Sequence, residues 1–160
     1  MTSDGERRAV AALEASGVEF TVTRHGRVGS LEEAAAARGV SPGDVVKSLV
    51  VRRGDDDFLF VLVTGDRAIS WPKLRALLGV SRLSLPDAST ALEVTGYERG
   101  TITPFGSLTA WPVVADERVR GRRVSIGAGA HGVAATVDGD ALVAALDATV
   151  ADVTQDASER

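Results

Sequence analysis

Six consecutive apolar residues, Phe58 to Val63, constrain the fold more than any other stretch of the chain. A strand with one face in water alternates polar and apolar side chains. An unbroken apolar run therefore predicts a central strand that is covered on both faces. A second apolar run, VVKSLVV, precedes it, and the intervening RGDDD suits a hairpin loop. Together the two runs predict an antiparallel pair in a sheet with other elements packed around it.

Capping residues and hydrophobic periodicity indicate the other elements. Ser30 with Glu33 is a capping-box pattern, and Ser41 before Pro42 begins another short helix. Helices are predicted over residues 6–16, 30–39, 42–47, 71–79, 86–96 and 138–148, with Ser70 as the cap of the fourth. Strands are predicted over residues 18–25, 48–53, 58–65, 81–85, 122–127, 133–137 and 149–153. Two further strands are expected within residues 97–116, one on each side of the loop there. The pattern predicts an α/β fold of the α+β type, a mixed, largely antiparallel sheet of about six to seven strands with helices packed around it.

Length and composition predict one globular domain over residues 1–160, with its last few residues disordered. A chain of 160 residues with 44% hydrophobic and 25% charged residues suits a single core. The absence of cysteine excludes disulfides, thiol catalysis and thiolate metal sites. The polar N-terminus has no signal-peptide core and no apolar run is long enough to span a membrane, so we expect a cytoplasmic protein.

The charge distribution leaves two interpretations open. The net charge of −4 does not by itself suggest a nucleic-acid partner, yet arginines gather in ERVRGRRV at positions 118, 120, 122 and 123. A solvated hairpin edge is the more ordinary explanation. The alternative is a contact for phosphates, which suit the geometry of arginine.

Lys47 is the first candidate for chemistry. It is one of two lysines in the chain and lies between Val46 and Ser48 in the apolar run. An unpaired ammonium in apolar surroundings costs free energy or lowers its pKa, so such a group suggests a use. The expected elements place Lys47 at a junction between helix and strand, as a buried amine.

Two glycine-containing loops are further candidates. GTITPFG, residues 100–106, has glycines at both ends and a proline inside, which lets its backbone approach a ligand closely. GAGAHG, residues 127–132, exposes backbone N–H groups that favour an anionic or carbonyl oxygen. Each loop is also adequate as a plain connection between strands, and no helix follows the second as a dinucleotide site would require.

Other chemistries find little support. His25 and His131 are far apart in sequence, and a lone histidine is more often structural than catalytic. With no cysteine, they give no metal-ligand spacing, and we expect neither a metal nor another cofactor. There is no G-x-S-x-G pattern for a serine hydrolase.

The order and spacing of these segments resemble a known family. VVKSLVV, then TGY with GTITPFG, then IGAGAHGV and the ending DGDALVAALDATVADVT resemble the YbaK/ProX family of free-standing aminoacyl-tRNA deacylases. That family is similar to the editing domain of bacterial prolyl-tRNA synthetases, and the resemblance extends from about Val18 to Val153.

The resemblance implies a set of site residues. Lys47 matches the family's essential lysine and is the expected catalytic residue. The expected substrate-binding residues are Ser48, Gly100, Ile102, Pro104, Phe105, Gly106, Gly127, Gly129, His131 and Gly132.

The implied function is trans-editing, in which a hydrolase removes a wrongly attached amino acid from tRNA and protects translational fidelity. Its partners would be mischarged aminoacyl-tRNA and an aminoacyl-tRNA synthetase. In the cysteinyl branch we would expect basic residues at the positions of Ala130 and His131 and an acidic residue near that of Ala134. This chain differs from that pattern. The substrate is thus open between the Cys-tRNA(Pro) type and another small amino acid such as alanine, serine or threonine. Two alternatives are a non-catalytic tRNA- or synthetase-binding module of the same fold, and an α/β domain with an unrelated pocket.

Overall fold

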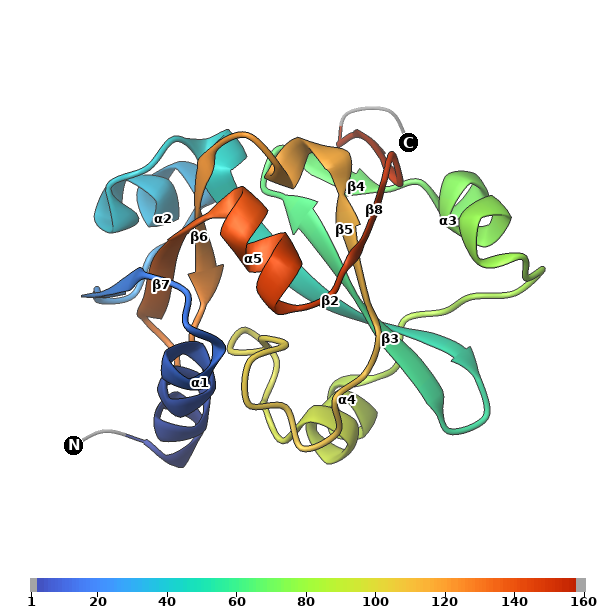
Figure 1. Cartoon of the computed structure of the whole chain (residues 1–160), viewed down its shortest axis with the longest axis horizontal. Helices are drawn as coiled ribbons and strands as arrows, with labels where there is room; N and C mark the ends of the chain where they lie inside the picture. The colour runs from blue at the N-terminus through green and yellow to red at the C-terminus, as the bar shows by residue number, and fades with distance from the viewer. Residues whose placement is uncertain (1–2, 158–160) are drawn as a thin grey trace.

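The two apolar runs form adjacent strands of a seven-stranded sheet in the computed structural model, which describes residues 3–157 (Figure 1). The strands of this sheet are β1 (Phe20–Arg24), β2 (Val45–Gly54), β3 (Asp57–Thr64), β5 (Val113–Asp116), β6 (Arg123–Gly127), β7 (Val133–Asp138) and β8 (Thr149–Ala151), in the order β1-β7-β6-β2-β3-β5-β8. A second sheet pairs β4 (Arg67–Ile69) with β9 (Thr154–Asp156).

The predicted fold class is confirmed. β2 and β3 form a long antiparallel hairpin with Lys47 opposite Val63, and β1–β7 and β6–β7 are also antiparallel. The parallel pairings β2–β6, β3–β5 and β5–β8 cover only two or three residue pairs each. The sheet is therefore mixed and largely antiparallel.

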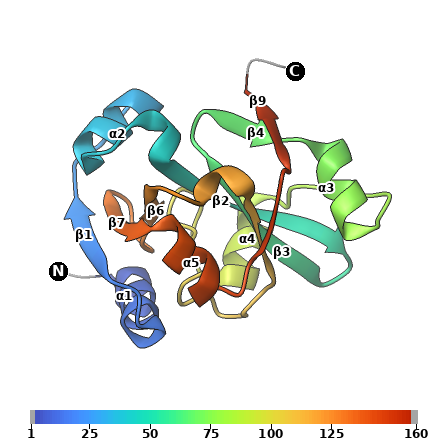
Figure 2. The same ribbon diagram turned by 45° about the horizontal axis from the view of Figure 1, so that its top comes forward.

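β3 has a hydrophobic core on each of its faces, as its unbroken apolar run predicts. Side chains alternate along a strand, so Phe58, Phe60 and Leu62 lie in a first core and Leu59, Val61 and Val63 in a second. Leu13 and Leu142 close the first core, whereas Leu74 and Val153 close the second. Figure 2 shows β4, β9 and α3 grouped at the opposite end of the molecule from α1.

The helices lie where the sequence predicts them, with ends that differ by up to three residues. They are α1 (Asp4–Ser16), α2 (Leu31–Arg38), α3 (Trp71–Leu78), α4 (Ala88–Thr95) and α5 (Gly139–Ala145), with 3-10 turns η1 (Pro42–Asp44) and η2 (Glu117–Val119). Ser30 caps α2 by accepting from the N–H of Glu33, and the left-handed Gly39 ends it. Ser70 precedes α3 but its side chain makes no capping hydrogen bond.

Several predicted boundaries are wrong. The helix expected over 42–47 is only the η1 turn, because Val45 and Val46 already pair with β6 as the start of β2. Residues 81–85 form no strand and make a single bridge, between Ser84 and Arg52. No strand enters the loop before Val113, and the short strands β4 and β9 were not expected.

Two expectations concern the ends of the chain and membrane insertion. The disorder expected for the last few residues falls beyond residue 157 and so lies outside the described residues. Within residues 3–157 no helix has the length and apolar character needed to cross a membrane.

Candidate functional site

A gap in the pairing of β2 opens a cavity at the middle of the sheet. On the edge away from β3, β2 pairs with β6 at Val45 and Val46, and farther along its residue Arg52 bridges to Ser84. Between these two points, residues 47–51 pair on that edge with no other described strand. A cavity of about 450 Å³ lies against this open stretch, a size that suits a small molecule.

The backbone of the open stretch presents hydrogen-bonding groups to the cavity. The N–H of Arg52 donates to the carbonyl of Ser84 over 2.7 Å, and the N–H of Ser84 donates to the carbonyl of Arg52 over 3.1 Å. Both backbone groups of Arg52 therefore point to this edge. Because backbone groups alternate between the edges of an antiparallel strand, those of Val50 and Ser48 point the same way.

The cavity wall is mainly apolar with charged side chains around it. Its apolar lining comes from β2, from the segment leading into α4, and from Ile102 in the loop after α4. The lining residues are Val45, Val46, Ser48, Leu49, Val50, Leu85, Pro86, Ala88, Ala91, Gly100, Ile102 and Gly127, together with the charged Arg38, Lys47, Asp87 and Arg99.

Lys47 lies in this wall, but the expectation that it is a buried amine is wrong. The residue is exposed, and it lies within the strand β2 rather than at a junction between helix and strand. Its Nζ donates to the backbone carbonyl of Arg67 over 2.9 Å. Partial burial lowers the pKa of Lys47, and the nearby carboxylate of Asp66 acts in the opposite direction.

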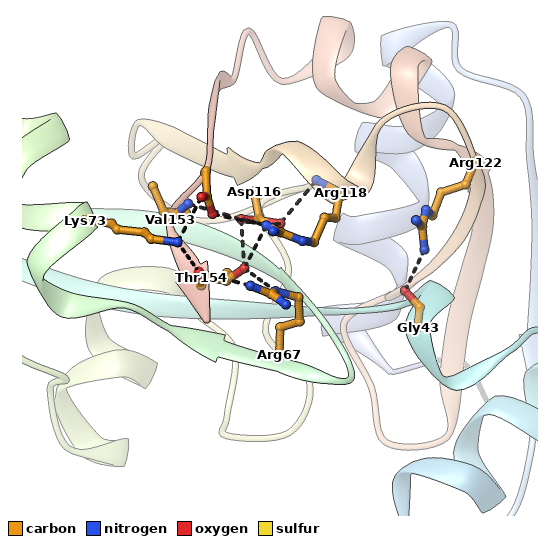
Figure 3. Close-up of polar contacts among 9 residues, drawn as sticks. Gly43, Arg67, Lys73, Asp116, Arg118, Arg122, Val153 and Thr154 are labelled. Atoms are coloured by element: carbon orange, nitrogen blue, oxygen red, sulfur yellow. Dashed lines mark hydrogen bonds and ion pairs between the residues drawn. The ribbon is translucent and has the colours of Figure 1, made fainter. Parts of the chain in front are cut away.

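Arg67, whose backbone carbonyl accepts the hydrogen bond of Lys47, belongs through its side chain to a polar network around Thr154 that Figure 3 shows. The guanidinium of Arg67 donates to Thr154 twice, from Nε to Oγ1 over 2.7 Å and from Nη2 to the carbonyl over 3.2 Å. Thr154 Oγ1 in turn donates to Oδ1 of Asp116 over 2.9 Å. Asp116 is completely buried and also accepts from the N–H of Val153. The network ties β4 and β9 to the end of β5.

Two cations complete the network around Asp152. Lys73 and Arg118 both contact its carboxylate, at 2.8 and 3.1 Å. Their hydrogen bonds lower the pKa of Asp152 to about 2. Arg118 also pairs with the buried Asp116.

Buried contacts fix the shape of the GTITPFG loop. The hydroxyl of Tyr97 donates to the carbonyl of Phe105 over 2.6 Å, and Arg8 lies over the Tyr97 ring and donates to the carbonyl of Gly106. A Cβ on Gly106 would lie 2.5 Å from the backbone oxygen of Arg8, in a left-handed conformation. Phe105 and Gly106 thus pack inward, while Gly100 and Ile102 reach the cavity.

The GAGAHG turn reaches the cavity only at its first residue, Gly127. A Cβ on Gly129 would meet the carbonyl of Gly5, and one on Gly132 that of His25, both at 2.3 Å. These glycines allow close packing of backbone on backbone. His131 is exposed, pairs with Glu98 over 3.2 Å and lies beside Gly100.

The structure thus brings together five of the eleven predicted site residues. Lys47, Ser48, Gly100, Ile102 and Gly127 line the cavity, whereas Pro104, Phe105, Gly106, Gly129, His131 and Gly132 do not. Sequence reasoning missed the segment Leu85–Ala88 and the two arginines, Arg38 and Arg99. No motif indicates them, and an arginine in the last turn of a helix, such as Arg38, is ordinarily a partner for the helix dipole.

The arginine strip is largely neutralised by ion pairs. Arg118 pairs with Asp116 and Asp152, Arg120 with Asp140, and Arg122 with Asp44. These pairs favour the structural interpretation of the strip over a phosphate contact. In the described part of the chain no group of three or more His, Cys, Asp or Glu residues could hold a metal ion.

Comparisons with known proteins find similarity to proteins that handle tRNA. The family model of the aminoacyl-tRNA editing domain matches residues 25–145. The proline–tRNA ligase of Bacillus licheniformis is 33% identical over 93 residues, which are 58% of this chain and 16% of the ligase. The ligase of Desulforamulus reducens is 39% identical over 88 residues, or 55% of this chain and 15% of the ligase. The chain thus spans less than a fifth of these curated relatives.

A solved structure matches over nearly the whole length. It belongs to a protein assigned provisionally as a trans-editing enzyme for prolyl tRNA synthetase. The TM-score is 0.87 at 28% sequence identity, with 97% of this chain and 99% of that chain covered.

Proposed function

This chain belongs to the aminoacyl-tRNA editing domain family, and from this premise we propose that it is a trans-editing hydrolase. Its reaction is the deacylation of mischarged aminoacyl-tRNA. The amino acid removed is small, of the Cys-tRNA(Pro) type or alanine, serine or threonine. It acts in the cytoplasm on tRNA that a synthetase has charged wrongly. The whole chain is one domain built for this reaction.

The observation that carries the proposal is the open edge of β2. It leaves the backbone N–H groups of Ser48 and Val50 beside a cavity of about 450 Å³ that Lys47, Gly100 and Gly127 also line. Hydrolysis requires an oxyanion to be stabilised next to a ribose, and fixed backbone donors supply that stabilisation without a side-chain nucleophile.

The reaction needs little activation because the ester carbonyl is already electrophilic. The oxygen of a water molecule bonds to the carbonyl carbon, and the carbonyl oxygen becomes an oxyanion. The bond to the ribose oxygen then breaks, and that oxygen takes up the proton that the water loses. A well-placed donor of the kind offered by Ser48 or Val50 contributes about 3 to 4 kcal/mol to this step.

Lys47 supplies positive charge at the wall where the ester and its neighbouring hydroxyl lie. Its ammonium is directed by the hydrogen bond to the carbonyl of Arg67. A fixed charge in a partly desolvated site stabilises a developing negative charge more strongly than it would in water. We assign Lys47 the catalytic role on this basis.

The test is a deacylation assay with a panel of mischarged tRNAs. Lys47→Ala should lower turnover about a hundredfold or more while the fold is unchanged by circular dichroism. Lys47→Arg, which keeps the charge, tests whether the position of the amine matters. Arg123→Met changes an exposed residue away from the cavity and should behave like the wild type.

Two results would contradict the proposal. A wild-type protein that binds tRNA but leaves every ester intact would be a non-catalytic binding module of the same fold. A Lys47→Ala variant with full turnover would remove Lys47 from the mechanism.

A further inference from the structure

Arg38 is a charged residue in the cavity wall that makes no ion pair with a carboxylate within residues 3–157. It is the last residue of α2 and lies at the end of the cavity where β2 and β6 separate. Its one hydrogen bond there is a long one, 3.5 Å from Nη1 to the hydroxyl of Ser125. Its Nε is buried and has no hydrogen-bond partner.

Two other partly buried arginines of the chain, Arg53 and Arg118, are neutralised by carboxylates. Arg53 makes two hydrogen bonds to Asp57, and Arg118 contacts two carboxylates. Their carboxylate partners raise the pKa of both side chains. Burial instead lowers the pKa of Arg38, and no carboxylate opposes it. An uncompensated guanidinium is costly, which suggests that its partner is a ligand.

The charges around the cavity also favour an anion. Arg99 and Lys47 line the same wall as Arg38. The carboxylate among the lining residues, Asp87, is already used as the cap of α4, where it accepts from the N–H of Thr90 over 2.7 Å. Three cations therefore face the cavity against one occupied carboxylate.

The cavity has two chemically different ends along β2. Arg38 marks the end near Val45, and the apolar Leu85 and Pro86 mark the end near the bridge at Arg52. The open stretch between them, residues 47–51, is about 13 Å long. A nucleotide has the same polarity, with an apolar base face and a charged phosphate separated by a sugar.

We propose that Arg38 binds an anionic oxygen group of the substrate, and that this group is the phosphate on the 5′ side of the terminal adenosine. This inference rests on the proposed function, since it takes the substrate to be the charged end of a tRNA. Guanidinium binds phosphate oxygens through two parallel N–H donors, which would satisfy the buried Nε. The other source of such an anion is the side-chain carboxylate of an acidic amino acid on the ester.

Binding of two small probes tests the site independently of turnover. The wild type should bind adenosine 5′-monophosphate more tightly than adenosine in a calorimetric titration. Arg38→Met should weaken binding of the monophosphate about tenfold or more and leave adenosine binding unchanged. Arg38→Lys should recover part of the loss, and Arg123→Met should match the wild type.

Thermal unfolding separates a ligand-binding arginine from a structural one. Arg38→Met keeps the apolar stem and removes an uncompensated charge, so its melting temperature should equal or exceed that of the wild type. A structural arginine would instead lower the melting temperature when replaced.

The source of the anion is decided with aspartyl and alanyl esters of adenosine, which carry no phosphate. If the anion is an amino-acid carboxylate, Arg38→Met slows hydrolysis of the aspartyl ester alone. If Arg38→Met binds the monophosphate like the wild type and treats both esters alike, the inference is overturned. A wild type that hydrolyses no ester, yet binds the monophosphate through Arg38, would sink the proposed function and leave this site standing.

Discussion

The ammonium of Lys47 lies between two opposing influences on its pKa. Burial lowers the pKa and the charge of Asp66 raises it. Asp66→Asn removes the second influence, so the pKa of Lys47 should fall further below its ordinary value. The chain has only two lysines, and Lys73→Arg leaves Lys47 as the single lysine signal in a ¹³C NMR titration.

The sign of this prediction follows from which form each influence favours. Burial favours the neutral amine, whereas the Asp66 carboxylate favours the ammonium. Replacing Asp66 therefore shifts the titration of Lys47 to lower pH, and Asp56→Asn, a change in the β2–β3 turn, should not shift it. A titration of Lys47 that moves to higher pH in Asp66→Asn would contradict the arrangement.

Sequence reasoning selects Lys47, which lines the cavity, but does not identify its hydrogen-bond partner. The apolar neighbours of Lys47 suggest burial, yet its side chain is exposed although Val45 and Val51, on the same face of β2, are buried. Its hydrogen-bond partner is the backbone carbonyl of Arg67, which no side-chain pattern can indicate. Sequence patterns do not indicate Arg38 for a related reason. Its importance comes from the absence of carboxylates near it in the described part of the folded chain.

At the level of elements, the cavity exists because β2 has different neighbours at its two ends. The sequence predicts the β2–β3 hairpin and the β6–β7 pair, since both connections are short. It does not predict that β6 pairs with β2 for only two residues or that Ser84 bridges to Arg52. These contacts join segments that are distant in sequence. The length of the open stretch of β2 depends on where the β2–β6 pairing ends and where the bridge at Arg52 lies.

The brace between β4 and β9 is a second arrangement of elements that sequence patterns do not indicate. Both strands have three residues, and polar side chains rather than apolar periodicity hold them. Thr154 provides the central hydroxyl, which accepts from Arg67 and donates to the buried Asp116. The brace therefore depends on side-chain pairing over long sequence separations.

Thr154→Val should destabilise the protein by about 1 to 3 kcal/mol, because the isosteric change leaves a buried carboxylate oxygen and a guanidinium N–H short of a partner. Thr154→Ser keeps the hydroxyl and should recover most of this loss. Thr21→Val, on the exposed side of β1, is the matched control and should cost little. Urea unfolding gives the three free energies, and equal values for Thr154→Val and Thr21→Val would refute the role of the hydroxyl.

On the scale of the whole molecule, the two cores share the central hairpin. β3 contributes alternate side chains to each core, and the first core draws on α1 and α5 while the second draws on α3 and Val153. Loss of β3 would remove three side chains from each core. The proposal that the whole chain is one domain therefore has a physical basis in a strand that both halves need.

The chain's two tryptophans allow this to be tested, because one lies at each core. Trp111 packs on the first core, with its ring centroid 5.3 Å from that of Phe58, and Trp71 packs on the second. In Trp71→Phe the fluorescence reports the first core, and in Trp111→Phe it reports the second. For a single cooperative domain, the fluorescence midpoint of each variant in urea should coincide with its own midpoint by circular dichroism. A fluorescence midpoint at a lower urea concentration than the circular-dichroism midpoint of the same variant would show that the two faces of β3 unfold separately. The single-domain proposal would then be wrong.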